Sequence, residues 1–357
     1  MIKVGIIGTG RATSISKGHL NGFRYHDDVE LIGIYDLSRE AMEQWCEAFG
    51  VSKELCYDSA EKLIHDADIV SICTPNFTHA EYICKCLEEN TGVICEKPIS
   101  STGADIPKIR GAMANTTAKS MVNLNYRYIP GIRMMHDYLA SGKAGRIYMI
   151  WHNMGGSRLA NESIGLEWRF VRAISGTGAL GDFGSHALDL LRYILGTDQP
   201  VLEAPCLKQA TFIRERVGKD GMRPVENDDC DMLLASLQGG GMYSLMLSRV
   251  GAVDSRLEVV AANAILSFRL AEPDRLYVQA RQPGEGYGPM EAKLAENARP
   301  CWYNAPEAEV PYLACAESVS AFIDAYRAGK TMATGLDYGI SILEETERLD
   351  KLAQEVR

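Results

Sequence analysis

Short runs of β-forming residues alternate with longer amphipathic stretches through the first third of the chain, and this alternation restricts the possible folds more than any other feature. The runs fall near residues 2–7, 29–35, 68–73, 92–96 and 119–124. Segments between them, such as 38–49 and 78–89, have apolar residues at helical spacing. Strands that alternate with helices are typical of a parallel sheet wrapped by helices. The sequence therefore predicts an α/β domain over residues 1–124.

The pattern changes near residue 145, where β-type runs follow one another with few helices between them. They fall near 146–152, 207–217, 230–237, 241–249, 255–261, 264–270 and 275–281. In the last run Leu276 and Val278 alternate with Tyr277 and Gln279, which indicates an antiparallel sheet with one wet face. Residues 282–309 are irregular and rich in proline and glycine, and helices are expected near 313–328 and 336–355. Residues 125–357 are therefore predicted to form a second, α+β domain.

Composition excludes several functional classes. A chain of 357 residues favours two domains, and 46% hydrophobic with 24% charged residues is typical of globular proteins. A net charge of -10 argues against binding to nucleic acid or to an anionic membrane. Ten cysteines are too few for a disulfide scaffold at this length. With no leader and no long apolar run visible, we expect a cytoplasmic protein with reduced cysteines.

A glycine-rich turn follows the first predicted strand. Gly8 and Gly10 would let the backbone approach a pyrophosphate at the start of the next helix, with Arg11 and Ala12 in the same turn. Thr13 occupies the place of a third glycine. Because glycine turns end many strands for steric reasons alone, this motif is weak evidence by itself.

Asp36 ends the second predicted strand, where a carboxylate can accept the ribose hydroxyls of NAD. It could instead cap the next helix, but Ser38 is available for that role. A carboxylate here would repel the 2′-phosphate of NADP, whereas Arg39 nearby would favour it. Together with the glycine turn, Asp36 predicts a Rossmann domain that binds NAD in preference to NADP.

Two further strand ends supply polar residues to the same edge of the sheet. They are Thr74-Pro75-Asn76 with His79, and Glu96-Lys97-Pro98. In an open parallel sheet ligands bind beyond the carboxyl ends of the strands, so we expect all of these residues in the cofactor site. Lys97 could be a surface lysine, but its position directly after a buried strand makes it a candidate catalytic residue. His79 is expected to cap or line the helix after Pro75.

The densest signal lies in residues 176–189, where glycines precede and interrupt a predicted helix. At 100° per residue, a helix starting near Asp182 places Asp182, His186, Asp189 and Tyr193 in one stripe. The alternative is a helix cap and a solvated histidine. The glycines favour a ligand site because they cost helix stability and admit close approach. Asp182 and His186 are thus candidate catalytic residues, and no metal is expected because a single histidine and no cysteine lie here.

These motifs together resemble the Gfo/Idh/MocA family of NAD(P)-dependent oxidoreductases. Supporting segments are Asn125-Tyr126-Arg127-Tyr128 and Glu167-Trp168-Arg169-Phe170. The resemblance implies a Rossmann domain followed by an α+β domain with a large open, mainly antiparallel sheet, commonly used for dimer or tetramer packing. It also implies that Lys97, Asp182 and His186 are catalytic. Tyr126, Arg127, Trp168 and Arg169 are candidates for substrate binding, with Asp182 and His186.

The expected activity is NAD-dependent oxidation of a secondary alcohol of a sugar, an anhydrosugar such as levoglucosan, or an inositol. His186 would be the general base, Lys97 would stabilise alkoxide character, and Asp182 would orient the substrate. One alternative is an NAD-dependent glycosidase of related fold, in which oxidation is transient. Another is a non-catalytic NAD-sensing regulator, which would have no need of all three residues. The expected partners are a small-molecule substrate and further copies of the chain.

Overall fold

The computed structural model describes residues 1–10, 14–251, 254–282, 284 and 286–355. It contains two compact units, one formed by Met1–Asn125 with Pro311–Leu343 and the other by Tyr126–Val310 with Glu344–Arg357. The sequence division at residue 124 places 311–343 in the second part, whereas these residues pack in the first unit. Residues far apart in the chain therefore build the first unit.

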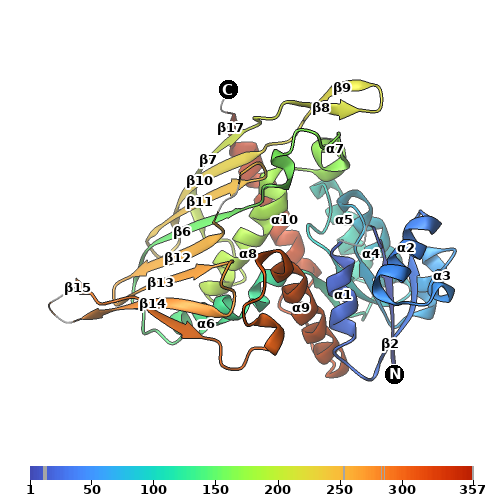
Figure 1. Ribbon diagram of the computed structural model, residues 1–357, viewed down its shortest axis with the longest axis horizontal. Coiled ribbons are helices and arrows are strands. Elements are labelled where there is room, and N and C mark those ends of the chain that lie inside the picture. The colour runs from blue at the N-terminus through green and yellow to red at the C-terminus, as the bar shows by residue number, and fades with distance from the viewer. Residues whose placement is uncertain (11–13, 252–253, 283, 285, 356–357) are drawn as a thin grey trace. The chain divides into compact units, whose positions relative to one another are not determined.

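The first unit is built on a five-stranded parallel sheet with strand order β2-β1-β3-β4-β5 (Figure 1). Its strands are β1 (Ile2–Ile7), β2 (Val29–Tyr35), β3 (Ile69–Ile72), β4 (Gly92–Cys95) and β5 (Ser120–Val122). Its first helices are α1 (Ser16–Phe23), α2 (Arg39–Phe49), α3 (Ala60–Asp66), α4 (His79–Glu88) and α5 (Ile106–Met113). Val4, Ile6 and Ile94 are fully buried in its core. The predicted parallel α/β domain is confirmed.

Two long helices close the chain, as the sequence predicts. They are α9 (Val310–Arg327) and α10 (Leu336–Leu352). Gly18 and Gly22 of α1 face α9 so closely that a Cβ atom at either would lie 2.6 Å from a side-chain carbon of Cys315 or Val319. Small residues therefore let α1 and α9 pack in direct contact. Within the described ranges, none of the helices combines the length and apolar character that crossing a bilayer requires.

The second unit is built on a ten-stranded mixed sheet with the path β15-β14-β13-β12-β6-β11-β10-β7-β17, and β16 pairs with β14. Its strands are β6 (Ile147–Gly155), β7 (Leu202–Ala210), β10 (Cys230–Leu237), β11 (Met242–Ser248), β12 (Arg256–Ala261), β13 (Ala264–Arg269), β14 (Arg275–Gln282), β15 (Gly286–Tyr287), β16 (Glu291–Leu294) and β17 (Gln354–Glu355). The β6–β11 and β7–β17 pairs are parallel, and the other pairs along this path are antiparallel. The predicted large, mainly antiparallel sheet is confirmed.

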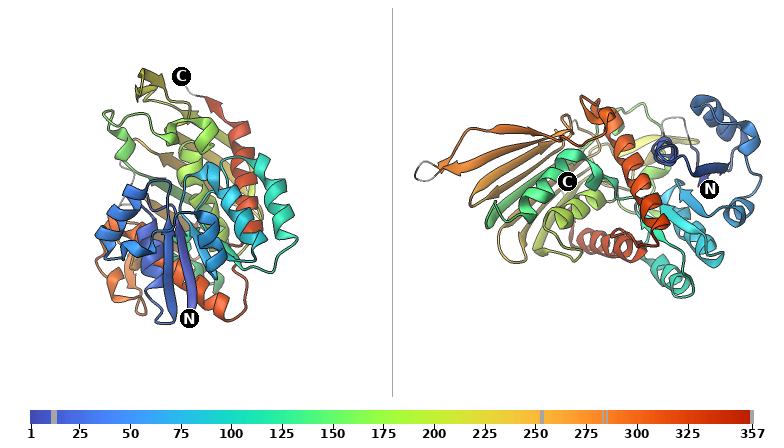
Figure 2. Two further views of the ribbon diagram at one scale, coloured as in Figure 1. Left: turned by 90° about the vertical axis from the view of Figure 1, so that its right-hand side faces the viewer. Right: turned by 90° about the horizontal axis from the view of Figure 1, so that it is seen from below.

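Helices cover one face of this sheet. Figure 2 shows α6 (Pro130–Ala140) and α8 (Ser185–Ile194) lying along it. On β10, buried Leu233 and Ala235 alternate with exposed Met232 and Leu234, so one face is packed and the other is open in this chain. The open face is markedly apolar, because Trp151 on β6 and Met242 on β11 are also about half exposed.

Three local predictions differ from the structure. The expected strand 207–217 stops at Ala210, because the Asp229 carboxylate accepts hydrogen bonds from the backbone amides of Phe212 and Ile213 and draws them out of the ladder. The chain then forms a separate hairpin of β8 (Glu215–Gly218) and β9 (Gly221–Pro224) (Figure 1). The segment 282–309 contains β15 and β16, which pair with β14.

The third difference concerns the helix expected to start near Asp182. A π-helical turn, Leu180–Gly184, precedes α8 (Ser185–Ile194). Angular spacing calculated for an α-helix does not apply across this wider turn. His186 and Asp189 accordingly lie on the buried side of α8, whereas Asp182 stays partly exposed.

Candidate functional site

The glycine turn after β1 is sterically restricted to glycine. Gly8 has φ +92°, and a Cβ atom there would lie 2.6 Å from the backbone of Cys73 and Thr74. Gly10 has φ +57° and donates its amide to Asp36 Oδ2 at 3.0 Å, while Thr9 Oγ1 lies 3.2 Å from the same oxygen. The turn and the end of β2 are thus joined directly. Arg11, Ala12 and Thr13 lie outside the described residues.

This arrangement fits the adenosine end of NAD, because it offers close backbone approach beside a carboxylate. Ser38 caps α2 by accepting a hydrogen bond from Ala41, so the cap does not require Asp36. Arg39, the residue that would favour NADP, donates to Glu43 Oε1 at 3.1 Å and to the Cys56 carbonyl at 3.2 Å. These bonds direct its guanidinium toward α2 and Cys56.

His79 joins the turns that follow β3 and β4. Its Nδ1 lies 2.7 Å from the carbonyl oxygen of Pro98 and its Nε2 lies 2.8 Å from that of Thr74. The ring is fully buried, and burial lowers its pKa although both carbonyls favour a protonated ring. A neutral ring has one N–H and so donates to one of the two carbonyls at a time. His79, the first residue of α4, therefore holds together the turn after Thr74 and the turn that contains Lys97 and Pro98.

A buried polar network lies under the carboxyl ends of the first unit's strands. Its members are His19, Ser71, Glu96, Asn123 and Cys315. Glu96 Oε1 accepts from Asn123 Nδ2 at 2.6 Å and pairs with His19 Nε2 at 2.9 Å. Burial raises the pKa of Glu96, but these two partners outweigh it and hold the pKa below its ordinary value. The network anchors the residue that directly precedes Lys97.

Sequence reasoning placed Glu96 in the site but missed His19, Asn123 and Cys315. The sequence signal that could have identified them was the presence of a polar residue within an otherwise apolar stretch. The ligand atoms of His19, Glu96 and Cys315 lie within 4.8 Å of one another, a spacing that a metal ion could use. However, Asn123 donates N–H groups to both Glu96 and Cys315, at 2.6 and 3.2 Å. A donor at this position suits a hydrogen-bond network better than a cation.

In the second unit, Asp228 holds the π-helical turn that contains Asp182. Its Oδ1 accepts the Gly178 amide at 2.8 Å and its Oδ2 accepts the Leu180 amide at 3.3 Å. A Cβ atom at Gly178 would lie 2.1 Å from the Asp228 carbonyl oxygen, so only glycine fits. Gly178 is therefore required by close packing against Asp228, which lies just before β10 and which sequence reasoning missed.

The predicted base, His186, lies against Tyr126. The two rings stack with centroids 4.4 Å apart and an interplanar angle of 9°. Burial, with the charges of Glu307 and Asp182, raises the pKa of Tyr126 to about 12, so its hydroxyl stays protonated near neutral pH. His186 is 7% exposed. The stack fixes the plane of the imidazole.

Arg127, predicted to bind substrate, is bound to Asp189. Its Nε lies 2.7 and 2.9 Å from the two carboxylate oxygens of Asp189, which is fully buried. Its guanidinium also lies 5.2 Å from the centroid of the Tyr193 ring. This ion pair connects the turn containing Tyr126 to the helix containing His186.

The segment Trp168–Phe170 (η6) contains the other predicted substrate residues. Arg169 stacks over the Trp168 ring at 4.3 Å, and both side chains are partly exposed. Glu167 pairs with Arg158 through two hydrogen bonds. Phe170 is buried in a small apolar cluster with Leu159 and Val225. Trp168 and Arg169 are thus available to a ligand while Phe170 anchors the segment.

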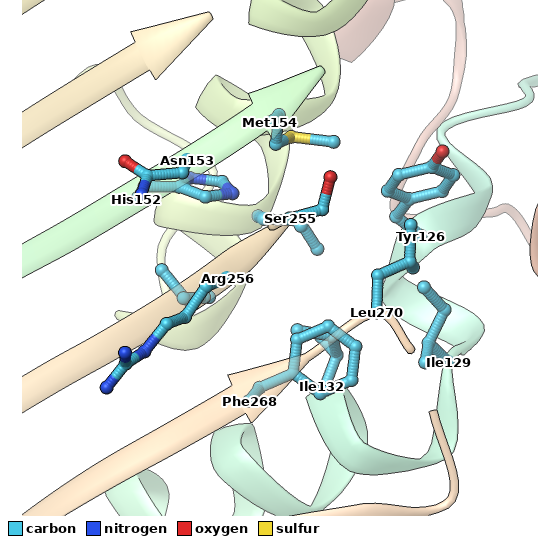
Figure 3. Close-up of a pocket in the computed structure, with 12 residues that line it drawn as sticks. Tyr126, Ile129, Ile132, His152, Asn153, Met154, Ser255, Arg256, Phe268 and Leu270 are labelled. Carbon is cyan, nitrogen blue, oxygen red and sulfur yellow. The ribbon is translucent and has the colours of Figure 1, made fainter. Parts of the chain in front are cut away.

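A small pocket lies on the packed face of the large sheet, and its lining includes Tyr126, His152 and Ser255 (Figure 3). Its volume of about 10 Å³ leaves room for roughly one water molecule. A sugar cannot enter it. His152 is fully enclosed there, with Nδ1 3.2 Å from the Tyr243 hydroxyl, and burial lowers its pKa to about 3.

Acid should therefore destabilise this unit through His152. The unfolded chain protonates His152 below about pH 6.5 and the folded chain does not until about pH 3, so lowering the pH favours unfolding. At pH 5.5 this amounts to about 1.4 kcal/mol relative to pH 7.5. We expect urea unfolding to show that the free energy of unfolding falls between pH 7.5 and pH 5.5 in the wild type. In His152→Gln this fall should be smaller by that amount.

His65→Gln is the matched control for the His152 experiment. This exposed side chain has its pKa raised by Glu89, so removing it cannot reduce the loss of stability in acid. An unchanged difference between pH 7.5 and 5.5 in His152→Gln would contradict the assignment.

Comparison with known proteins supports a single family. Levoglucosan dehydrogenase of Pseudarthrobacter phenanthrenivorans is 32% identical over 203 residues, which cover 52% of this chain and 51% of that protein. Glucose-6-phosphate 3-dehydrogenase of Bacillus subtilis is 26% identical over 278 residues, 76% of either chain. A solved levoglucosan dehydrogenase in complex with NADH and L-sorbose has TM-score 0.83 at 22% identity, covering 99% of this chain and 96% of that one, and so shares the fold.

Family models match both units. The Gfo/Idh/MocA model described as an oxidoreductase family with an NAD-binding Rossmann fold matches residues 2–124. The C-terminal domain model of the same family matches residues 132–267. The resemblance inferred from the motifs is confirmed, and the chain belongs to the Gfo/Idh/MocA family of NAD-binding oxidoreductases.

Proposed function

We propose that this protein is an NAD-dependent dehydrogenase that oxidises a secondary alcohol of a sugar, anhydrosugar or inositol to a ketone. The observation that carries the proposal is that a partly exposed Asp182 lies on the π-helical turn directly before α8, and that His186 near the start of α8 is held in a ring stack with Tyr126. A carboxylate and an imidazole supplied by adjoining elements suit proton removal from a hydroxyl. The names of the similar proteins, which act on levoglucosan, glucose 6-phosphate and inositols, support the substrate class.

The residues Gly8, Gly10, Asp36, Thr74, Pro75, Asn76 and Glu96 would hold NAD, together with Arg11, Ala12 and His79 as a supporting side chain. NAD supplies a hydride acceptor at the nicotinamide C4. His186 accepts the proton of the substrate hydroxyl as the carbon-bound hydrogen leaves with its electron pair. Lys97 donates a hydrogen bond to the reacting oxygen and stabilises its negative charge. The substrate would leave as a ketone, and its hydroxyl proton would be held on His186.

Substrate recognition is assigned to the partly exposed aromatic and charged side chains of the second unit. Tyr126 and Trp168 offer apolar ring faces to the C–H face of a sugar, and Arg169 and Asp182 offer groups for its hydroxyls. Arg127 acts mainly through its ion pair with Asp189, which supports the Tyr126 stack. These assignments predict a polyol substrate that has an apolar C–H face.

Cofactor preference should favour NAD. Asp36 opposes the 2′-phosphate of NADP, and Arg39 is bound to Glu43 and Cys56. Steady-state kinetics with both cofactors should give a higher kcat/KM with NAD. Asp36→Ser should lower the ratio of kcat/KM with NAD to kcat/KM with NADP by at least about tenfold. Equal or better efficiency of the wild type with NADP would contradict the role of Asp36 and favour Arg39.

A panel of sugars, anhydrosugars and inositols tests the activity itself. Purified protein should form NADH in proportion to ketone with at least one member of the panel. A glycosidase of related fold would instead release an alcohol from a glycoside without net NADH, and an NAD-sensing regulator would turn over no member of the panel.

We further propose that the protein is a homodimer or homotetramer that acts in the cytoplasm. The apolar open face around Trp151, Met232, Leu234 and Met242 supports assembly, because such patches are costly in water. Each of the ten cysteines is a free thiol, which suits a reducing compartment. Light scattering at micromolar concentration would test the assembly.

A further inference from the structure

We propose that Arg249 is a positioning residue that holds Asp182 and the Trp168–Phe170 segment in a fixed mutual arrangement. The inference rests on the proposed function, because it takes Asp182 to act on the substrate. Arg249 directly follows β11 and is 3% exposed. It lies in the second unit, as do all the residues that it contacts.

The first contact is with Asp182. Arg249 Nε lies 3.4 Å from Asp182 Oδ2, and the Asp182 side chain is 34% exposed while that of Arg249 is 3% exposed. The cation is therefore enclosed in protein while the carboxylate still faces solvent. A buried guanidinium needs an anionic or hydrogen-bonding partner, so this pair orients the Asp182 carboxylate.

The second contact is with the segment that contains the proposed substrate residues. Arg249 Nη2 lies 3.4 Å from the carbonyl oxygen of Arg169, and its guanidinium lies 5.7 Å from the centroid of the Phe170 ring. The same carbonyl accepts from Asn227 Nδ2 at 2.9 Å and from Ser175 Oγ at 3.2 Å. Three side chains thus contact the carbonyl oxygen of Arg169, and these contacts fix the backbone of the residue that follows Trp168.

A neighbouring arginine, Arg216, anchors Phe170 and the chain that precedes the Trp168–Phe170 segment. Arg216 lies over the Phe170 ring at 4.4 Å and donates to the carbonyls of Asn161 and Ile164 at 2.9 and 3.0 Å. Asp229 lies near both arginines and supplies negative charge. Arg216 contacts only the anchoring side of the segment, whereas Arg249 also contacts Asp182. Arg249 therefore couples the proposed catalytic carboxylate to the substrate-binding segment from the buried side, while Arg158, which donates to Glu167 and interacts electrostatically with Asp182, is about half exposed.

The geometry requires arginine specifically. A planar guanidinium can face a carboxylate with one edge, a carbonyl with another and an aromatic ring with its plane. A lysine ammonium at the same position would keep a positive charge near Asp182 but could not also serve Arg169 and Phe170. Replacing Arg249 with lysine should therefore keep the contact with Asp182 and remove the contacts with Arg169 and Phe170.

Two variants and a control test the proposal on the whole enzyme. Arg249→Met should lower kcat/KM by about 10- to 100-fold, since misplaced reacting groups cost this much, with NAD affinity unchanged. Arg249→Lys should retain most of kcat but raise KM. Arg172→Met is the control, because Arg172 lies on α7 (Arg172–Ser175), two residues after Phe170, and pairs with Asp350. It should behave as wild type.

A pH profile and a double-mutant cycle separate positioning from general loss of packing. The acid limb of kcat/KM, which the base His186 sets, should move to higher pH in Arg249→Met and stay in place in Arg249→Lys, because only the former removes a positive charge from this region and so favours a protonated imidazole. Arg158, which also interacts with Asp182, is present in both variants. In an Asp182→Asn background, Arg249→Met should lower kcat by less than about threefold further.

The outcomes distinguish this inference from the proposed function. Wild-type kcat/KM and pH profile in Arg249→Met, or full additivity with Asp182→Asn, would overturn the role of Arg249. If Arg249→Met does not fold, an unchanged KM in Arg249→Lys overturns it. Wild-type turnover by Asp182→Asn itself would instead contradict the proposed function.

Discussion

Replacing Lys97 with alanine should lower kcat by about 100- to 1,000-fold, because the ammonium stabilises charge that develops on the reacting oxygen in the transition state. NAD affinity should stay nearly intact, since the buried network around Glu96 and the contacts of His79 remain. Stopped-flow or steady-state measurements of NADH formation, together with NAD titration by fluorescence, would check both values.

Lys108→Ala provides the matched control for Lys97→Ala. Lys108 is an exposed lysine on α5 in the same unit, and its removal should leave kcat unchanged. A folded, NAD-binding Lys97→Ala protein that turns over its best substrate at the wild-type rate would remove Lys97 from the mechanism.

Replacing His186 with alanine should reduce kcat by a similar factor through loss of the general base. The rate of oxidation should rise with pH in the wild type as this base loses its proton, and the limb should move or vanish in the variant. His186→Ala also removes the ring that stacks on Tyr126, so Tyr126→Leu, which removes the stack but keeps the base, serves as the comparison. A pH limb that survives unchanged in His186→Ala would refute the assignment.

The double variant tests whether the two residues serve one chemical step. If Lys97 and His186 act in the same proton transfer, the combined loss should be much smaller than the product of the two single losses. Strict additivity would place them in separate roles.

Local sequence was enough to predict the parallel sheet and the cofactor turn. The five N-terminal strands were found because their apolar runs are short, continuous and bounded by helical spacing. Gly8 could be singled out because it begins a G-x-G motif directly after the first strand, and its positive φ and close backbone neighbour show that only glycine fits there. Lys97 was selected by topology, because strand ends in a parallel sheet converge on one edge.

Boundaries and local geometry were less accessible. The strand expected over 207–217 ends early because the Asp229 carboxylate accepts hydrogen bonds from two backbone amides. The residues of the strand itself give no indication of these hydrogen bonds. Similarly, the π-helical turn before α8 depends on Asp228 holding the Gly178 and Leu180 amides. In both cases a distant side chain outcompetes the regular backbone pattern.

The sequence by itself determined the fold class, the NAD-binding family and the identity of the residues proposed for chemistry. Only the tertiary structure decided how those residues are supported. It pairs Arg127 with Asp189, places Arg249 beside Asp182, and joins His19 and Asn123 to Glu96. Periodicity reports which face of an element is apolar, but a buried ion pair joins charges from elements far apart in the chain. In the sequence, each residue of such an ion pair looks like an ordinary surface charge, and only folding brings the two residues together.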